Sequence, residues 1–290
     1  MSIDIKVIAP SSKSSDTLDL LYSAKQRLKQ YNINLIFSSD IFLGAELPFF
    51  AASIKTMKQD FINAITSSRY NIIWAARGGY GAANIAEECI DIKPSSKEKI
   101  LIGFSDITAM HILFNQFYYL PTVHGPVVSS FEKNNMNFTI FENIFRKKES
   151  KYNLQKINNK TYSELAGKLI GGNLKVLCTL IGTNLHPNFD GKILLLEDVN
   201  EPSYSIHRNL MHMKKAGLLE NLKAIIFAEF TESDHFVEQT LQNFIDNNLP
   251  KLPAFRVRNI GHVENNLPII LGSYSSIRDL TLTVANPFQL

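Results

Sequence analysis

The chain has 290 residues, of which 45% are hydrophobic and 20% are charged, and its formal net charge is +3 at pH 7. This length is enough for one large core or two smaller ones, and the composition is typical of globular proteins. The small net charge, without a long basic stripe, argues against a nucleic-acid partner. No apolar run approaches about eighteen residues, and no charged-then-apolar leader follows Met1. We therefore expect neither a membrane span nor a signal peptide.

The cysteine pattern indicates a reducing compartment. Cys89 and Cys178 lie far apart within apolar helical patterns, as buried thiols do, and favour neither a disulfide nor a metal site. No His-Glu-x-x-His motif, paired Cys-x-x-Cys or Asp-rich loop occurs, so no metal centre is expected. The expected location is the cytoplasm.

The first half of the chain alternates short apolar runs with amphipathic segments. Buried strands are predicted over residues 3–9, 34–37, 72–76, 100–102 and 122–124. Helices are predicted to begin after Asp16, to span residues 57–65 and 82–89, and to begin directly after Ser105. This alternation predicts a parallel sheet covered by helices, with ligand-binding groups at the carboxyl ends of its strands.

The sequence turns polar from residue 134 to residue 160, where we place a domain boundary. The predicted division is a first domain over 1–145, a linker over 146–165 and a second domain over 166–290. Further strands are predicted over 167–172, 192–196, 224–228, 255–257, 269–274 and 280–284, with helices over 173–181, 205–218 and 237–246. The fold class is therefore α/β, with two domains.

A candidate nucleophile lies in the stretch KILIGFSDIT at residues 99–108. A strand that turns sharply into a helix exposes the side chain at the bend and points the first free helical N–H groups toward it. Ser105 is thus placed as a nucleophile, with donors beside it for an oxyanion. The alternative is that Ser105 or Asp106 simply caps the helix.

A glycine loop, RGGYG at residues 77–81, follows the third predicted strand. It fits neither the dinucleotide fingerprint, since Asn84 stands where a third glycine or alanine is expected, nor a P-loop. The loop could be a plain tight turn. We rank a turn that also supplies an oxyanion-hole N–H above a phosphate-binding loop.

A serine nucleophile requires a base, and two of the seven histidines stand at strand ends beside glycine, namely His124 and His262. The sequence alone does not choose between them. His111 is expected to be packed within its helix, whereas the remaining histidines are expected at the surface: His186, His207, His212 and His235.

A carboxylate at the end of a buried strand usually orients such a base, and Glu197 and Asp198 both qualify. Because neighbours on a strand point to opposite faces, only one of them is expected to serve. Both could instead cap the loop that follows.

With these groups identified, the whole chain resembles the serine-type L,D-carboxypeptidase family, which includes the microcin C immunity proteins. The matching stretches, in family order, are RGGYG (77–81), IGFSDITAMH (102–111), HGPV (124–127), GKLIGGNL (167–174), ILLLEDVNEPSY (193–204), RNLMHMKKAGLL (208–219) and GHVENNLP (261–268). Seven motifs over nearly the whole chain make the resemblance specific.

The resemblance implies a role for each matching residue. Ser105 would be the nucleophile, His262 the general base and Glu197 the group that orients it. The oxyanion hole would be formed by the amides of Gly79 and Asp106, and Tyr80 and Asn173 would contact substrate.

The resemblance also implies an amino-terminal α/β domain with the serine and a carboxyl-terminal β-rich α/β domain with the glutamate and histidine. The active site would lie between them, usually in a homodimer. The reaction would be cofactor-independent removal of the terminal D-alanine from murein tetrapeptides during cytoplasmic cell-wall recycling. No nucleic-acid or membrane partner is implied.

Two alternatives stay open. The same chemistry could act on a peptidyl-nucleotide antibiotic of the microcin C type, although the single tryptophan, Trp74, lies in a predicted strand and is poorly placed to stack on a base. The chain could also be a non-catalytic nucleotide-binding module. Three arginines could hold a substrate carboxylate, and the sequence does not choose among Arg208, Arg256 and Arg258.

Overall fold

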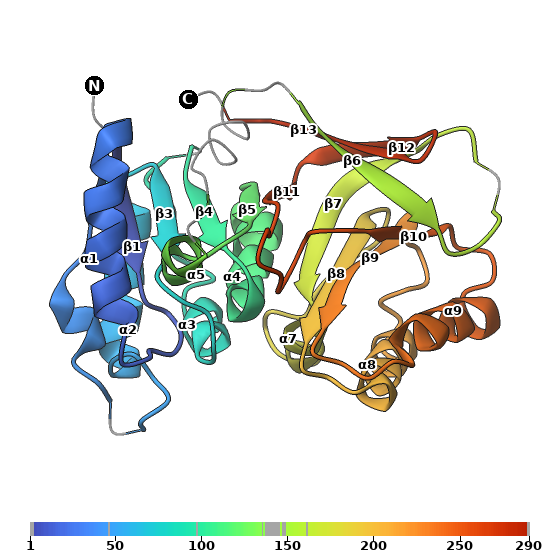
Figure 1. Ribbon diagram of the computed structural model, residues 1–290, viewed down its shortest axis with the longest axis horizontal. Coiled ribbons are helices and arrows are strands. Elements are labelled where there is room, and N and C mark those ends of the chain that lie inside the picture. The colour runs from blue at the N-terminus through green and yellow to red at the C-terminus, as the bar shows by residue number, and fades with distance from the viewer. Residues whose placement is uncertain are drawn as a thin grey trace. The chain divides into compact units, whose positions relative to one another are not determined.

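The computed structural model describes residues 3–45, 47–96, 98–134, 136, 146, 149–160 and 162–288. The chain divides into two compact units, unit 1 (Met1–Phe138) and unit 2 (Thr139–Leu290). Figure 1 labels the helices and strands of both. The predicted two-domain α/β architecture is confirmed.

Unit 1 is built on a parallel sheet with its strands in the order β2-β1-β3-β4-β5. The strands are β1 (Ile3–Ile8), β2 (Ile33–Ile36), β3 (Ile72–Ala75), β4 (Ile100–Gly103) and β5 (Thr122–His124). Every residue of β3 and β4 is buried, as expected for apolar strands covered on both faces.

The helices of unit 1 fall into two packed groups, α1 with α5 and α2 with α3 and α4 (Figure 1). Their bounds are α1 (Thr17–Leu28), α2 (Ile54–Thr66), α3 (Ala82–Glu87), α4 (Thr108–Ile112) and α5 (Val128–Lys133). Shorter helical turns are η1 (Lys29–Tyr31), η2 (Ser39–Phe42), η3 (Ser105–Ile107) and the π-helical η4 (Leu113–Tyr118).

The strand order decides where a site can form in unit 1. Strand β1 lies between β2 and β3, so the direction in which successive strands are added to the sheet reverses at β1. In open α/β sheets, ligands bind at such switch points, at the carboxyl ends of the strands. The loops that follow β1, β3 and β4 therefore meet at one edge.

Unit 2 contains a closed barrel in the order β10-β6-β13-β12-β7-β8-β9. Its strands are β6 (Glu149–Lys156), β7 (Leu165–Asn173), β8 (Ile193–Val199), β9 (Ala224–Thr231), β10 (Ala254–Val257), β12 (Tyr274–Arg278) and β13 (Thr281–Ala285). The remaining elements are the short strand β11 (Ile269–Leu271) and the helices α7 (Leu174–Thr179), α8 (Ser203–Lys215) and α9 (Val237–Asn248).

The barrel has a parallel part and an antiparallel part. Strands β7, β8, β9 and β10 run parallel, and helices follow β7, β8 and β9 along the chain. The carboxyl ends of these four strands therefore share one rim. Strands β6, β13 and β12 close the barrel through antiparallel pairs.

The polar segment after unit 1 differs from the expected linker. The expected domain end at residue 145 lies outside the described residues, but β6 falls within the segment 146–165 and pairs with both β13 and β10. Only Tyr152 and Leu154 of this strand are buried, Ser150 is half-buried, and the other residues are exposed. Two inward side chains are enough to hold one strand on a barrel, which is why its composition resembles that of a loop.

Candidate active site

The first candidate group is the serine turn that follows β4. Ser105 has φ of 63°, in the left-handed region that few residues other than glycine adopt, and it begins η3. Gly103 makes this bend possible, because a Cβ at that position would lie 2.9 Å from the Ile107 side chain. The bend from strand to helix was predicted, and neither η3 nor α4 has a side-chain cap, so the capping alternative for Ser105 and Asp106 is wrong.

The glycine loop lies against this turn. A Cβ added at Gly78 would lie 3.2 Å from the Ser105 hydroxyl oxygen, which is tighter than ordinary van der Waals contact. Gly79 has φ of 122°, and a Cβ there would lie 2.5 Å from the side chain of Ser12. The Ser12 hydroxyl accepts a 3.0 Å hydrogen bond from the Tyr80 amide. The loop is therefore held tightly beside Ser105 by segments that follow β1 and β4.

Asp106 follows the serine, and its carboxylate turns inward. Its Oδ2 accepts a 2.6 Å hydrogen bond from the Ser11 hydroxyl and a 2.9 Å hydrogen bond from the Ala82 amide. Burial raises the pKa of Asp106, although both of these hydrogen bonds act to lower it. Asp106 thus caps α3 instead of its own helix.

The second candidate group is a histidine–glutamate pair in unit 2. The Nδ1 of His262 lies 2.7 Å from Oε2 of Glu197, which is fully buried at the carboxyl end of β8. Gly261 allows this approach, because a Cβ there would lie 3.0 Å from the same carboxylate oxygen. Since a carboxylate only accepts, Nδ1 carries the hydrogen and Nε2 is the basic nitrogen.

The pair sets the protonation behaviour of His262. Burial lowers the pKa of the imidazole, but the adjacent Glu197 carboxylate, together with the charges of Asp198 and Glu232, raises it, so that the pKa of His262 lies above its ordinary value. The backbone is also held, because the Thr231 hydroxyl donates a 3.1 Å hydrogen bond to the His262 carbonyl. The imidazole is therefore both oriented and electrostatically stabilised in its charged form.

The structure distinguishes the two histidines that the sequence left open. His124 is fully buried, with its ring 6.0 Å from the rings of Phe104 and His111. His111 is packed as predicted, and burial lowers its pKa to about 3. His262 is the one that pairs with a strand-end carboxylate. Of the other histidines, His207 is half-buried. The remaining three are exposed: His186, His212 and His235.

Asp198, the neighbour of Glu197 on β8, makes hydrogen bonds of its own and has a structural role. It accepts hydrogen bonds from the Asn173 side chain at 2.9 Å and from the Lys175 amide at 3.0 Å. Burial, together with repulsion from Glu197, raises the pKa of Asp198 to about 6. Asn173 in turn caps α7, with its Oδ1 accepting from the Val176 amide at 3.1 Å. These bonds give Asn173 a role in fixing α7, and its contact with substrate stays a prediction.

Tyr80 is presented differently from Asn173. Its ring stacks on Phe50 at 5.6 Å and meets the edge of Phe49 at 5.7 Å, while 54% of the residue is exposed. Phe49 and Phe50 were not among the site residues predicted from sequence, and they precede α2 in an irregular segment. A contact between Tyr80 and substrate stays a prediction, and its geometry allows one.

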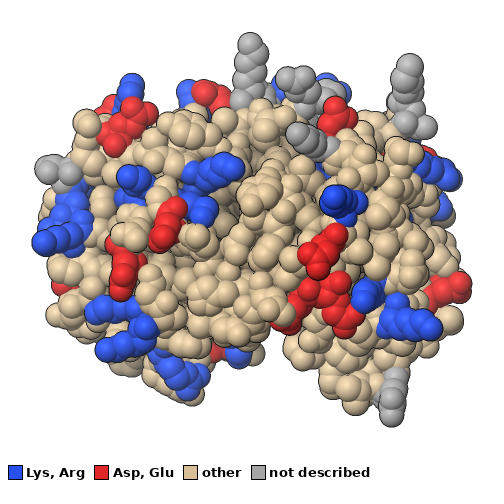
Figure 2. Space-filling view, turned by 180° about the vertical axis from the view of Figure 1, so that it is seen from behind, with Lys and Arg blue, Asp and Glu red and all other residues tan. Residues whose placement is uncertain are grey.

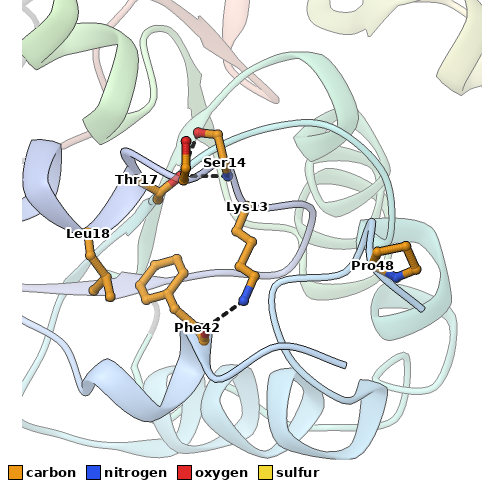
Figure 3. A pocket seen from close by; sticks show the side chains of 7 residues that line it. Lys13, Ser14, Thr17, Leu18, Phe42 and Pro48 are labelled. Atoms are coloured by element: carbon orange, nitrogen blue, oxygen red, sulfur yellow. Dashed lines mark hydrogen bonds between the residues drawn. The ribbon is translucent and has the colours of Figure 1, made fainter. Parts of the chain in front are cut away.

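A pocket of about 310 Å³ lies next to the serine-rich segment after β1 (Figure 3). Lys13 points into it and donates a 2.9 Å hydrogen bond to the Phe42 carbonyl, and Leu18 and Pro48 contribute apolar walls. Among the cations considered from sequence, Arg256 is buried and donates to Ala228 and Glu238, so it is engaged within unit 2.

On the face that Figure 2 shows, basic and acidic side chains are interspersed, and the described residues there form no continuous basic stripe. No cluster of three or more potential metal ligands occurs among the described residues. Within the same residues, no helix combines the length and apolar character needed to cross a membrane. Both cysteines are free and buried, as predicted.

Comparison with known proteins identifies the family. The family profile of the LD-carboxypeptidase N-terminal domain matches residues 5–125, and that of the LD-carboxypeptidase C-terminal domain matches residues 166–277. The chain belongs to the LD-carboxypeptidase family. The Rickettsia conorii protein named "Putative carboxypeptidase" is 36% identical over 285 residues, covering 95% of this chain and 88% of that protein. The murein tetrapeptide carboxypeptidase of Pseudomonas aeruginosa is 26% identical, over 79% of this chain and 76% of the relative.

Solved structures of LD-carboxypeptidase relatives share the fold. The muramoyltetrapeptide carboxypeptidase from Oxalobacter formigenes superposes with a TM-score of 0.84 at 22% identity, covering 97% of this chain and 98% of that one. An MccF-like protein from Bacillus anthracis gives a TM-score of 0.80 at 20% identity, covering 98% and 97%. The two-domain architecture is therefore that of the LD-carboxypeptidases.

Proposed function

We propose that this LD-carboxypeptidase is a serine hydrolase that removes the terminal D-alanine from murein tetrapeptides. The observation that carries the proposal is the 2.7 Å contact between His262 and Glu197, because it orients the imidazole, leaves Nε2 as the basic nitrogen and stabilises the imidazolium that forms when Nε2 accepts a proton. Family membership and the strained, glycine-flanked turn at Ser105 support it.

The proposed mechanism uses a Ser105–His262–Glu197 triad. Nε2 of His262 takes the proton of Ser105 as the hydroxyl oxygen attacks the carbonyl carbon before the terminal D-alanine. The resulting oxyanion accepts hydrogen bonds from the amides of Gly79 and Asp106. His262 then gives its proton to the leaving amine, which releases D-alanine and leaves an acyl-enzyme. Water, deprotonated by His262, hydrolyses the ester and restores Ser105.

Glu197 has a supporting role in this scheme. It accepts the Nδ1 hydrogen, keeps Nε2 basic, and stabilises the imidazolium that forms after proton transfer. Because Glu197 is fully buried, its charge acts on His262 with little screening by water. We further propose that the enzyme works in the cytoplasm during cell-wall recycling, as a homodimer, without a cofactor.

The test is incubation of the purified protein with disaccharide tetrapeptide and mass spectrometry of the product. We expect loss of one alanine, and we expect Ser105→Ala to lower kcat by roughly 10⁴- to 10⁶-fold. Ser68→Ala is the matched control, because Ser68 is an exposed serine of the same unit outside the site. An intact tetrapeptide, or a Ser105→Ala variant as active as the Ser68→Ala control, would refute the proposal.

A parallel incubation distinguishes the other substrate class of the family. A peptidyl-nucleotide with an aminoacyl linkage to adenylate is offered under the same conditions. Preference for the murein peptide, measured as a higher kcat/KM, supports the recycling role. A higher kcat/KM for the nucleotide conjugate would instead assign the same triad to antibiotic hydrolysis.

A further inference from the structure

The buried carboxylate of Asp106 lies between two loops, the one that follows β1 and the glycine loop that follows β3. Its Oδ2 accepts from the Ser11 hydroxyl, which follows β1, and from the Ala82 amide, which follows the glycine loop. Only 5% of Asp106 is exposed. We propose that these three residues, here named the Asp106 clasp, set the distance between the glycine loop and Ser105, with Asp106 as the positioning residue.

The clasp fixes the glycine loop at the end that Ser12 does not hold. Ser12 binds the Tyr80 amide in the middle of the loop, whereas Asp106 binds Ala82 directly after its last glycine. Gly78 and Gly79 lie on the other side of Tyr80, within van der Waals reach of Ser105 and Ser12 respectively. The segment after β1 thus contacts the loop through Ser12 and the clasp through Ser11.

A buried carboxylate at this position costs free energy unless it accepts strong hydrogen bonds. Burying a charge costs free energy, and an apolar side chain of similar size would pack without that cost. Here one carboxylate oxygen accepts two hydrogen bonds, one from a hydroxyl and one from the amide that begins α3. These two hydrogen bonds therefore connect the loops that follow β1, β3 and β4.

The expected effect on catalysis follows from the proposed function, on which this inference rests. The Gly79 and Asp106 amides must both donate hydrogen bonds to the same oxyanion. The clasp connects Asp106 to the loop that carries Gly79. A displacement of about 1 Å in such groups can lower a rate by about 10²-fold. Loss of the clasp should thus lower kcat while substrate affinity changes little.

The experiment compares Asp106→Ala, Asp106→Asn and Ser11→Ala with the wild type. We expect kcat to fall by about 10²-fold in Asp106→Ala and by about tenfold in Ser11→Ala. Asp106→Asn, which keeps an acceptor oxygen, should recover part of the loss. KM should change by less than about threefold, and the pH profile should keep its shape because the His262–Glu197 pair is intact.

Asp60→Asn is the control for loss of a half-buried acidic group in the same unit. Asp60 pairs with Lys6 at 2.6 Å and contributes nothing to the proposed site. This variant should unfold at lower urea concentration but keep kcat within about twofold of the wild type. A clasp that serves stability alone would give the same result in Asp106→Ala as in Asp60→Asn, and the inference would be wrong.

A second readout separates this inference from the murein assignment. The rate at which a fluorophosphonate probe labels Ser105 reports the nucleophile and the oxyanion hole without a murein substrate. If the wild type is labelled but does not cleave tetrapeptide, the substrate assignment fails and the labelling rates of the variants still test the clasp. Equal labelling rates in the wild type, Asp106→Asn and Ser11→Ala, or no labelling of wild-type Ser105, would overturn it, even if Asp106→Ala does not fold.

Discussion

His262 combines two opposed influences on one imidazole. Burial disfavours its charged form, whereas Glu197 at 2.7 Å, together with the charges of Asp198 and Glu232, favours it more strongly, so the pKa of His262 is raised. A general base must be neutral to accept a proton. The activity of the proposed enzyme should therefore fall on the acid side at a higher pH than an ordinary histidine, with a pKa of about 6.5, would give.

Substitution of Glu197 tests this electrostatic account. In Glu197→Gln the charge that raises the pKa of His262 is removed while burial continues to lower it. We expect the acid limb of the kcat/KM profile to move to lower pH, together with a fall in kcat at neutral pH because the imidazolium loses its partner. NMR titration of the His262 ring provides a direct check. An acid limb at the wild-type pH would show that Glu197 does not control His262.

The limits of sequence reasoning are clear at these same residues. Ser105 and the alternation of Glu197 and Asp198 followed from strand patterns, since period-two alternation and a strand end suffice to place them. The choice between His124 and His262 did not, because both follow a strand and neighbour a glycine. The family resemblance implied His262, and the three-dimensional contact with Glu197, which joins residues 65 positions apart, gives the physical distinction.

At the scale of single elements, the pairing of β7 with β8 depends on a glycine. Gly171 has φ of 140°, and a Cβ there would lie 1.8 Å from the Leu195 carbonyl oxygen on the neighbouring strand. Gly182 also has a positive φ, of 86°, but nothing lies within 4 Å of the position its Cβ would take. Comparison of substitutions at these two positions therefore distinguishes the effect of backbone conformation from the effect of a steric clash.

We predict that Gly171→Ala disrupts the barrel, whereas Gly182→Ala folds. The second variant should lose only about 1 kcal/mol, the usual cost of a left-handed alanine. The first must also separate two buried strands and should yield little folded protein. Expression level and circular dichroism of the two variants check this, and equal stability of both would contradict it.

Elements also differed in how readily they could be predicted. The strands of unit 1 and the parallel strands of unit 2 are apolar runs, and they were found within a few residues of their observed ends. β6 was missed because only two of its side chains face inward, and the β12–β13 hairpin was found only in part. Barrel closure by such strands depends on partners distant in sequence, which composition does not report.

For the molecule as a whole, the proposed triad takes Ser105 from unit 1 and Glu197 and His262 from unit 2. Groups that act in one reaction step give non-additive losses when removed together. We predict that the Ser105→Ala/His262→Ala double variant is no less active than Ser105→Ala alone. Measurement of kcat for both single variants and the double variant checks this. Multiplicative losses would mean that the two residues act separately.

The architecture of the whole molecule was the most predictable feature. Alternating strands and helices, followed by a polar stretch and a second set of elements, were enough to expect two α/β domains. The expected position of the division, with a linker over 146–165, stays a prediction, although β6 occupies part of that segment because a polar strand and a linker have similar composition. The family followed from seven motifs in order, a signal that no single motif carries.

The main chain at Ser105 has φ of 63°, a conformation that is unfavourable for serine but easy for glycine. Ser105→Gly should therefore gain about 1 kcal/mol of folding free energy, or roughly 2 °C in melting temperature by calorimetry, while abolishing turnover. A melting temperature at or below that of the wild type would argue against this account. The Ser105→Gly variant is thus expected to be more thermostable than the wild type but inactive. Selection for thermostability at this position would act against catalysis.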